Sequence, residues 1–201
     1  MPSLNMFARL GLFMAPGFLD TELCTQFRSE LRVSTQRQTN IIGGGVNAVN
    51  ENIRSSKYGT VSTPTSTTVH ARLLALKPEL ENHFNVRLSG CEKPSFLVYR
   101  AGDFQLAHRD RSDDPCDPAF IRQRQLSAII FLNNCVEVPG EDTYGGGAFT
   151  FYGLLPGPRW TKCGLPFIGE AGLLMVFRSN EAHEVKPVTF GERYTIVAWF
   201  F

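Results

Sequence analysis

The spacing of apolar residues along the 201-residue chain is helical before about residue 90 and strand-like after it. In "FLDTELCTQFRSELR", Leu or Phe recurs every four residues after Asp20, a good helix-capping residue, which predicts a helix over Thr21–Val33. The segment "TTVHARLLALKPELENHF" has a second apolar face, made of Val69, Leu73, Leu76 and Leu80. Pro78 interrupts this segment and is predicted to split or kink its helix.

The apolar runs from residue 95 onward are short or alternating, and Gly, Pro, Asn and Asp separate them. They include "SFLVYR", "RQLSAIIFLNN", "GGAFTFYG", "GLLMVFRS" and "RYTIVAWFF". This pattern is typical of a β-sandwich or barrel. Because a helical part (about 1–90) precedes a β part (about 91–201), the sequence predicts one α+β domain over residues 1–201, with N-terminal helices packed on one face of the β core.

In two segments the apolar residues have no regular spacing. Residues 35–65 are rich in Gly, Ser, Thr and Asn, and residues 153–171 form a long insertion between two predicted strands. Segments of this length in a compact domain are usually mobile or part of a site. Both are therefore candidates for the cover or wall of a pocket.

Composition narrows the class of protein. The net charge is +1 and the chain has no Lys/Arg run, so no nucleic-acid partner is expected. Five cysteines without a C-x-x-C pair argue against a disulfide framework and for a reducing compartment, so a cytoplasmic location is expected. The apolar start has no basic region and is interrupted by Arg9 and Pro16, which predicts neither a signal peptide nor a membrane span.

The segment "FQLAHRD" places two potential metal ligands one residue apart. In a strand, Phe104, Leu106, His108 and Asp110 share one face, and the first two are predicted to be buried. His108 and Asp110 then lie ~7 Å apart along the strand, which suits a metal ion between their tips. An isolated H-x-D is more often the polar end of a strand, so this segment needs support from elsewhere in the chain.

That support comes from two residues near the C-terminus. His183 follows an apolar strand, and two His with one carboxylate are the ligand set of non-haem Fe(II) oxygenases, although a capped core histidine is the alternative. Arg193 opens the next apolar strand, where its planar fork suits a carboxylate; a salt bridge at the strand end is the alternative. A two-residue turn at Phe190-Gly191 would place His183 and Arg193 on opposite faces, whereas a chain that crosses between two sheets places both inside.

Together these features resemble the Fe(II)/2-oxoglutarate-dependent oxygenases, in particular the prolyl 4-hydroxylase-like group. "YRAGDFQLAHRD" is similar to the group's Y-x-x-G-x-x-x-x-x-H-x-D segment. "RQRQLSAIIFLNN" and "GGGAFTF" are similar to its R-x-x-T-x-x-x-Y-L-N and G-G-x-x-x-F pair. The C-terminal block "GLLMVFRSNEAHEVKPVTFGERYTIVAWF" is the most specific match, and the resemblance extends over nearly the whole chain.

The resemblance implies a fold and a set of site residues. The fold is a double-stranded β-helix, or jelly roll, with iron at its open end. The implied iron ligands are His108, Asp110 and His183, and Arg193 is implied to bind the distal carboxylate of 2-oxoglutarate. Tyr99 and Ser127 match family positions near the same cosubstrate.

The resemblance also implies a reaction that uses Fe(II), 2-oxoglutarate and O2 and yields succinate and CO2. Because Asp110 is present, hydroxylation of an unactivated C–H bond is expected, in a peptidyl proline, an amino acid or a small metabolite. Arg124 and Trp199 match positions that touch the substrate proline in the group, whereas Gln105 replaces an aromatic residue of the group. Two alternatives stay open: a cupin-type metal enzyme that does not use 2-oxoglutarate, and a non-catalytic β-sandwich that binds a sugar or protein.

Overall fold

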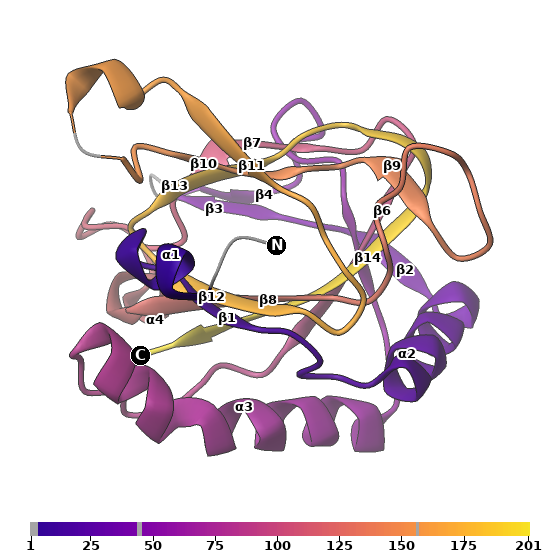
Figure 1. Ribbon diagram of the computed structural model, residues 1–201, viewed down its shortest axis with the longest axis horizontal. Coiled ribbons are helices and arrows are strands. Elements are labelled where there is room, and N and C mark those ends of the chain that lie inside the picture. The colour runs from indigo at the N-terminus through magenta and orange to yellow at the C-terminus, as the bar shows by residue number, and fades with distance from the viewer. Residues whose placement is uncertain (1–3, 44–45, 156) are drawn as a thin grey trace.

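Two antiparallel sheets pack against each other in the computed structural model, which describes residues 4–43, 46–155 and 157–201 (Figure 1). The larger sheet has the order β1 (Phe13–Ala15), β12 (Leu174–Arg178), β8 (Leu126–Phe131), β14 (Val188–Phe200), β6 (Ser95–Arg100), β5 (Lys57–Gly59), β2 (Gln36–Gln38), and β9 (Tyr144–Gly146) pairs with β14. The smaller sheet has the order β11 (Gly164–Phe167), β10 (Phe149–Tyr152), β13 (Ala182–Val185), β7 (Gln105–His108). The strands β3 (Ile41–Gly43) and β4 (Val46–Ala48) form a separate hairpin.

Helices cover the larger sheet on the side away from the smaller one (Figure 1). They are α2 (Thr21–Val33) and α3 (Thr63–Phe84); the short helices α1 (Leu4–Arg9), α4 (Ala119–Gln123) and a 3-10 turn (Pro158–Trp160) lie elsewhere. The predicted helix over Thr21–Val33 is confirmed, and the Asp20 side chain caps it by accepting a hydrogen bond from the Leu23 amide at 2.8 Å. The predicted α+β class, with helices on one face of the β core, is therefore confirmed.

Of the two outcomes predicted at Pro78, a split or a kink, the split is wrong, because α3 continues through this residue as one helix. A proline in a helix removes one backbone donor and crowds the preceding turn. Here the buried face of α3 lies on both sides of Pro78: Val69 and Leu73 precede it and Leu80 and Phe84 follow it. Packing of this whole face on the larger sheet outweighs the local cost.

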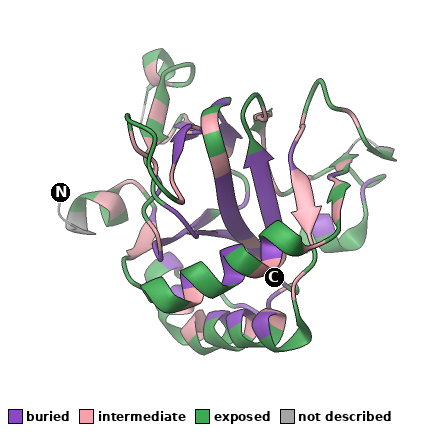
Figure 2. Ribbon diagram, turned by 90° about the vertical axis from the view of Figure 1, so that its right-hand side faces the viewer, coloured by how far each residue is buried: buried purple, intermediate pink, exposed green. Residues whose placement is uncertain are grey.

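The strand β14 separates two apolar cores. Its residues alternate in direction, as strand geometry requires. Tyr194, Ile196, Ala198 and Phe200 are buried together with residues of α2 and α3. Arg193, Thr195, Val197 and Trp199 point the other way, toward a cavity between the sheets. Figure 2 shows some of the strands buried and the outer sides of the helices exposed. Both Arg193 and Tyr194 are buried, so the two faces of β14 are inside the protein there.

The chain crosses from one sheet to the other between β13 and the main part of β14. The first residues of β14 pair with β9, and its residues from Glu192 onward pair with β6. Gly191 lies at the crossing with φ +72°, a conformation that favours glycine, and an added Cβ would overlap the Thr143 carbonyl oxygen. The crossing, rather than a two-residue hairpin, is therefore the arrangement that the chain adopts.

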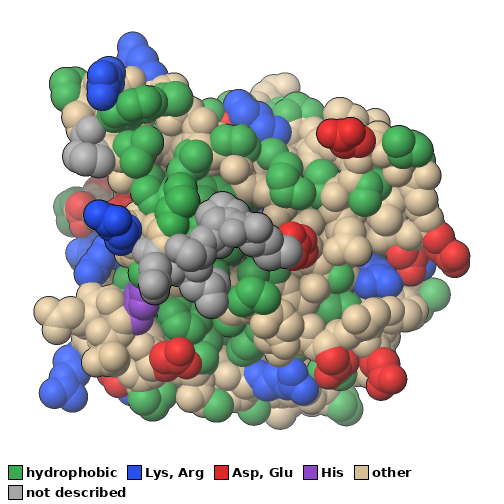
Figure 3. All heavy atoms as spheres, viewed as in Figure 1, with side chains coloured by type: hydrophobic (Ala, Val, Ile, Leu, Met, Phe, Trp, Pro, Cys, Tyr) green, Lys and Arg blue, Asp and Glu red, His purple; other side chains and the backbone are tan. Residues whose placement is uncertain are grey.

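The two segments without a regular period contain short elements. Residues 35–65 hold the three-residue strands β2 to β5, while residues 153–171 hold the 3-10 turn and β11; residues 44, 45 and 156 lie outside the described part. On the face shown in Figure 3, basic and acidic side chains are interspersed, in line with the net charge of +1. Within the described ranges, no helix has the length and apolarity needed to cross a bilayer.

Replacing Gly191 with Ala should destabilise the fold. The positive φ alone costs an alanine about 1–3 kcal/mol in the free energy of unfolding, and the overlap with Thr143 adds to it. Gly102→Ala is the matched control, because Gly102 has φ +91° but open space around its Cα. Urea denaturation should show a larger loss for Gly191→Ala than for Gly102→Ala; equal losses would mean that the crossing tolerates the overlap.

Candidate functional site

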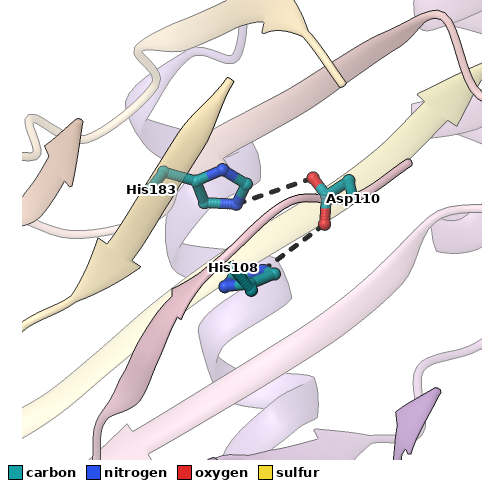
Figure 4. A group of neighbouring side chains, drawn as sticks. All are labelled: His108, Asp110 and His183. Atoms are coloured by element: carbon teal, nitrogen blue, oxygen red, sulfur yellow. Dashed lines mark ion pairs between the residues drawn. The ribbon is translucent and has the colours of Figure 1, made fainter. Parts of the chain in front are cut away.

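Three side chains converge where β7 and β13 lie side by side (Figure 4). His108 ends β7 and lies directly opposite His183 of β13, while Asp110 follows two residues after β7 ends. The Nε2 atom of His108 lies 3.5 Å from one Asp110 oxygen, and the Nε2 atom of His183 lies 3.6 Å from the other. One ligand atom from each residue lies within 4.8 Å of the other two, so the three could hold one metal ion.

Backbone carbonyls fix the orientation of both imidazoles. The Nδ1 atom of His108 is 3.0 Å from the carbonyl oxygen of Leu106, and the Nδ1 atom of His183 is 3.0 Å from that of Glu181. A carbonyl only accepts, so each Nδ1 carries the proton and each Nε2 keeps its lone pair; that of His108 accepts a hydrogen bond from the Gln105 amide nitrogen at 2.9 Å. The lone pairs face the centre, and this is the usual way in which a protein orients a metal-binding histidine.

The ionisation states also suit a metal ion. Burial and the neighbouring His108 lower the pKa of His183 to about 4, so this imidazole is neutral near pH 7. Burial raises the pKa of Asp110, but the two histidines and a hydrogen bond from Ser127 outweigh it and lower this pKa well below its usual value. Metal binding requires neutral imidazole and ionised carboxylate, and both are present before any metal arrives.

A small inner cavity lies between the sheets beside the three side chains. It is lined by His108, Asp110 and His183 and by the inward face of β14, which includes Arg193. Arg193 is fully buried, and its Nε and Nη2 atoms have no hydrogen-bond partner; Nη1 has only Thr195 Oγ1 at 3.4 Å. The guanidinium carbon lies 5.1 Å and 5.3 Å from the ring centres of Tyr99 and Phe131. Burying an unpaired guanidinium is costly, so the cavity is built to receive an anion.

The other predicted cosubstrate residues also line this cavity. Tyr99 lies directly across from Arg193 in the β6–β14 pair, and its hydroxyl donates to the Gln105 amide oxygen at 3.2 Å. Ser127 is buried, and its Oγ lies 2.9 Å from Ser179 Oγ. The Gln105 amide nitrogen lies 2.9 Å from His108 Nε2, so this side chain links the Tyr99 hydroxyl to the candidate metal centre.

An outer cavity of about 370 Å³ adjoins the same centre, because His108 and Asp110 line both spaces. Arg124 and Trp199 come together in its wall, where the guanidinium carbon lies 3.7 Å from the indole centre. Glu92 binds this guanidinium through Nε at 2.7 Å and Nη2 at 2.9 Å. Arg124 is thus already paired within the described structure.

The predicted burial of Phe104 and Leu106 is wrong. Phe104 is partly exposed before β7 begins, and Leu106 is 47% exposed in the wall of the outer cavity. The reason is that β7 lies at the edge of the smaller sheet, so the face that carries His108 looks onto an open cavity. The strand also ends at His108, and Asp110 reaches the centre from the chain beyond it.

Two residues at the site were missed by the sequence analysis. Thr195 lies two residues after Arg193 in one strand, so the period of two could have placed both on the same face. Arg54 lines both cavities but comes from the segment without a period. Its position depends on backbone hydrogen bonds to the β7 region, from Ser55 N to Phe104 O at 3.1 Å and from Leu106 N to Ile53 O at 2.9 Å. No local sequence signal marks such a contact.

Comparison with known families agrees with this geometry. Residues 94–201 match the family model described as the 2OG-Fe(II) oxygenase superfamily, where 2OG is 2-oxoglutarate. The chain belongs to this superfamily. The oxygenase is therefore a 2-oxoglutarate-dependent dioxygenase that uses Fe(II), 2-oxoglutarate and O2. The family match confirms the predicted enzyme class and cofactors, and it decides against a cupin-type enzyme and a non-catalytic binding protein.

Solved structures resemble the oxygenase along almost its whole length. A prolyl-4-hydroxylase from Pseudomonas putida is 21% identical, with a TM-score of 0.69 over 98% of each chain. A prolyl hydroxylase from Trichoplax adhaerens, solved with a hypoxia inducible factor peptide, is 19% identical, with a TM-score of 0.66 over 98% of this chain and 86% of that one. The alpha ketoglutarate dependent epimerase SnoN of nogalamycin biosynthesis is 21% identical, with a TM-score of 0.63 over 98% and 82%.

These identities are low, so the likeness shows the fold. It confirms the predicted jelly-roll core of the oxygenase. A search of curated protein sequences gave no significant match.

Replacing His183 with Ala should abolish tight binding of Fe(II) by the oxygenase. Changes in residues that only orient a ligand already cost about 10- to 100-fold in metal affinity, so the loss of a ligand should exceed about 100-fold. His83→Ala is the matched control, since His83 is exposed on α3, which packs on the larger sheet, whereas β7 and β13 belong to the smaller sheet. Anaerobic Fe(II) titrations measure both; unchanged affinity in His183→Ala would remove this residue from the centre.

Proposed function

We propose that this oxygenase hydroxylates an unactivated C–H bond of an organic substrate, either a peptidyl proline, an amino acid or a small metabolite. In this proposal, His108, Asp110 and His183 hold the iron. Arg193 binds the distal carboxylate of 2-oxoglutarate, and Tyr99 and Ser127 line its site. O2 would be the oxidant at the bound iron: two of its four electrons would come from the oxidative decarboxylation of 2-oxoglutarate to succinate and CO2, and two from the C–H bond that is hydroxylated.

The observation that carries the proposal is the buried, unpaired guanidinium of Arg193 in the same cavity as the three potential ligands. A planar fork with two free donors fits a carboxylate by two parallel hydrogen bonds. The inner cavity is lined both by this guanidinium and by the three potential metal ligands, which suits a cosubstrate that has a carboxylate and also binds a metal. A salt bridge at the strand end, the alternative for Arg193, has no acidic partner among the described residues.

The chain also orders and shields the centre. The His183 ring stacks on Phe149 with ring centres 5.0 Å apart and meets Phe177 edge-on at 4.9 Å. These rings exclude water from one side of the centre, which strengthens charge interactions there. Asp110 occupies a ligand position with an ionised oxygen, and this supports hydroxylation rather than transfer of a halide.

Arg124 and Trp199 are proposed to contact the substrate from the wall of the outer cavity. Their side chains are stacked, and Glu92 holds the guanidinium in place, so they offer a rigid surface. The prolyl hydroxylases with similar folds support a peptidyl proline as one candidate, while the epimerase with the same fold shows that the fold leaves the reaction outcome open.

The proposal is tested by adding Fe(II) and 2-oxoglutarate to the protein without oxygen. Chelation of the iron by 2-oxoglutarate should produce a metal-to-ligand charge-transfer band in the visible spectrum. Failure of the band to appear would contradict the assigned site.

Arg193→Ala should weaken binding of 2-oxoglutarate by roughly 10- to 150-fold, since charge-assisted hydrogen bonds contribute ~1.5–3 kcal/mol. Arg193→Lys keeps the charge but loses the fork, so its defect should be smaller. The iron affinity of both variants, measured in parallel, should change much less. Normal 2-oxoglutarate affinity in Arg193→Ala would mean that the cosubstrate binds elsewhere.

A further inference from the structure

The outer cavity has more positive charge than its own residues neutralise. Its lining includes the charged or titratable side chains of Arg54, Glu92, His108, Arg109, Asp110 and Arg124. His108 and Asp110 belong to the candidate metal centre, and Glu92 is bound to Arg124. The two remaining arginines form no ion pair with a described residue: Arg54 donates to Ser56 Oγ, and Arg109 donates to the Asn180 carbonyl.

Of these two cations, Arg54 is the one beside the reacting centre. It lines the inner cavity as well as the outer one, together with His108, Asp110 and His183. Arg109 is exposed and lines only the outer cavity. An anion that enters the outer cavity and approaches the metal therefore meets Arg54.

Arg54 is also held in place from several directions. Its Nε donates to Ser56 Oγ at 2.9 Å, and its guanidinium carbon lies 5.8 Å from the centre of the Tyr58 ring. Its backbone forms a β-bridge with Gln105 at the edge of the smaller sheet. The terminal nitrogens have no hydrogen-bond partner among the described residues, and a side chain ordered in advance loses little entropy on binding.

The rest of the cavity rim is apolar. Ten large hydrophobic side chains are exposed in the described structure, and four of them line this one cavity: Ile42, Ile53, Leu106 and Phe120. Single exposed hydrophobic residues are ordinary, but a group around one cavity indicates a binding surface. The cavity thus combines an apolar rim with a cation near the metal.

We propose that the substrate of this oxygenase has an apolar body and a carboxylate, and that the carboxylate binds Arg54 while the apolar body contacts the rim. This inference rests on the proposed function, because it assumes that the outer cavity is the substrate site. A blocked proline inside a peptide lacks such an anion, so the proposal favours a free acid, or a peptide that presents its C-terminal carboxylate.

The experiment compares acids with their amides. Protein loaded anaerobically with Fe(II) and saturating 2-oxoglutarate is titrated with N-acetyl-L-leucine or N-acetyl-L-leucinamide, and with N-acetyl-L-proline or N-acetyl-L-prolinamide. A third pair is the acetylated tripeptide Ala-Ala-Pro with a free or an amidated C-terminus, which separates a peptide source from a free acid. Saturating 2-oxoglutarate keeps these acids away from Arg193, and the shift of the charge-transfer band reports binding.

In the parent protein, at least one acid should bind about 10-fold or more tightly than its amide, as expected for a charge-assisted pair. Arg54→Gln should bring this ratio near one, and Arg54→Lys should give an intermediate ratio. Arg37→Gln is the matched control: Arg37 lies 5.7 Å from the centre of the same Tyr58 ring but lines neither cavity. It should keep the parent ratio, because loss of stacking alone does not remove the anion site.

Three outcomes overturn the inference while the charge-transfer band itself is present. The first is equal binding of acids and amides in the parent, and the second is a preference that survives Arg54→Gln. The third is that no compound of the three pairs shifts the band. If 2-oxoglutarate gives no band at all, the proposed function fails and the inference fails with it.

Discussion

The structure depends on the strand β14, whose two faces lie in two different parts of the protein interior. One part is apolar, and the other holds a buried charge. One face of β14 is apolar and packs with the helices, while the other face carries the buried Arg193 guanidinium toward the cavity between the sheets. Because side chains alternate along a strand, a shift of one residue in its register would bury the arginine in the helical core. The register is held by six paired residues with β6 on one side and six with β8 on the other. The pairing of this central strand thus fixes the position of the Arg193 guanidinium in the cavity.

The parts of the fold that the sequence predicted are those with a strong local period or a clear cap. The helix at Thr21–Val33 and the strands of the β core follow directly from the spacing of apolar residues and the capping Asp20. The split expected at Pro78 does not occur. The local cost of a proline can be read from the sequence, whereas the packing of α3 on the sheet cannot. The predicted burial of Leu106 failed for a similar reason. Alternating apolar residues do not distinguish an edge strand beside a cavity from a strand inside a core.

The residues of the candidate site also divide into those that the sequence predicted and those that it did not. His108, Asp110, His183 and Arg193 were identified by residue type, spacing and family resemblance, and the structure brings all four to one cavity. Arg54 could not be found, since its segment has no period and reaches the cavity only through backbone contacts with distant residues. The part of the cavity wall around Arg54 is therefore harder to predict than the potential metal ligands, because it is built from long-range contacts rather than from motifs.

The fixed orientation of the His108 and His183 imidazoles affects which metal ions the protein can bind. Each proposed histidine ligand is oriented by a carbonyl two residues before it, so the rings need little rearrangement on metal entry, and the Gln105 amide on His108 Nε2 is the group that has to move aside. Imidazole and carboxylate ligands also accept cobalt, nickel, copper and zinc, and most of these bind such sites more strongly than Fe(II) does. The types of the three ligands alone therefore do not select iron over these metals. Loading with iron is then governed by which metals the surroundings supply during folding, and an inactive preparation can be a correctly folded protein that carries the wrong ion.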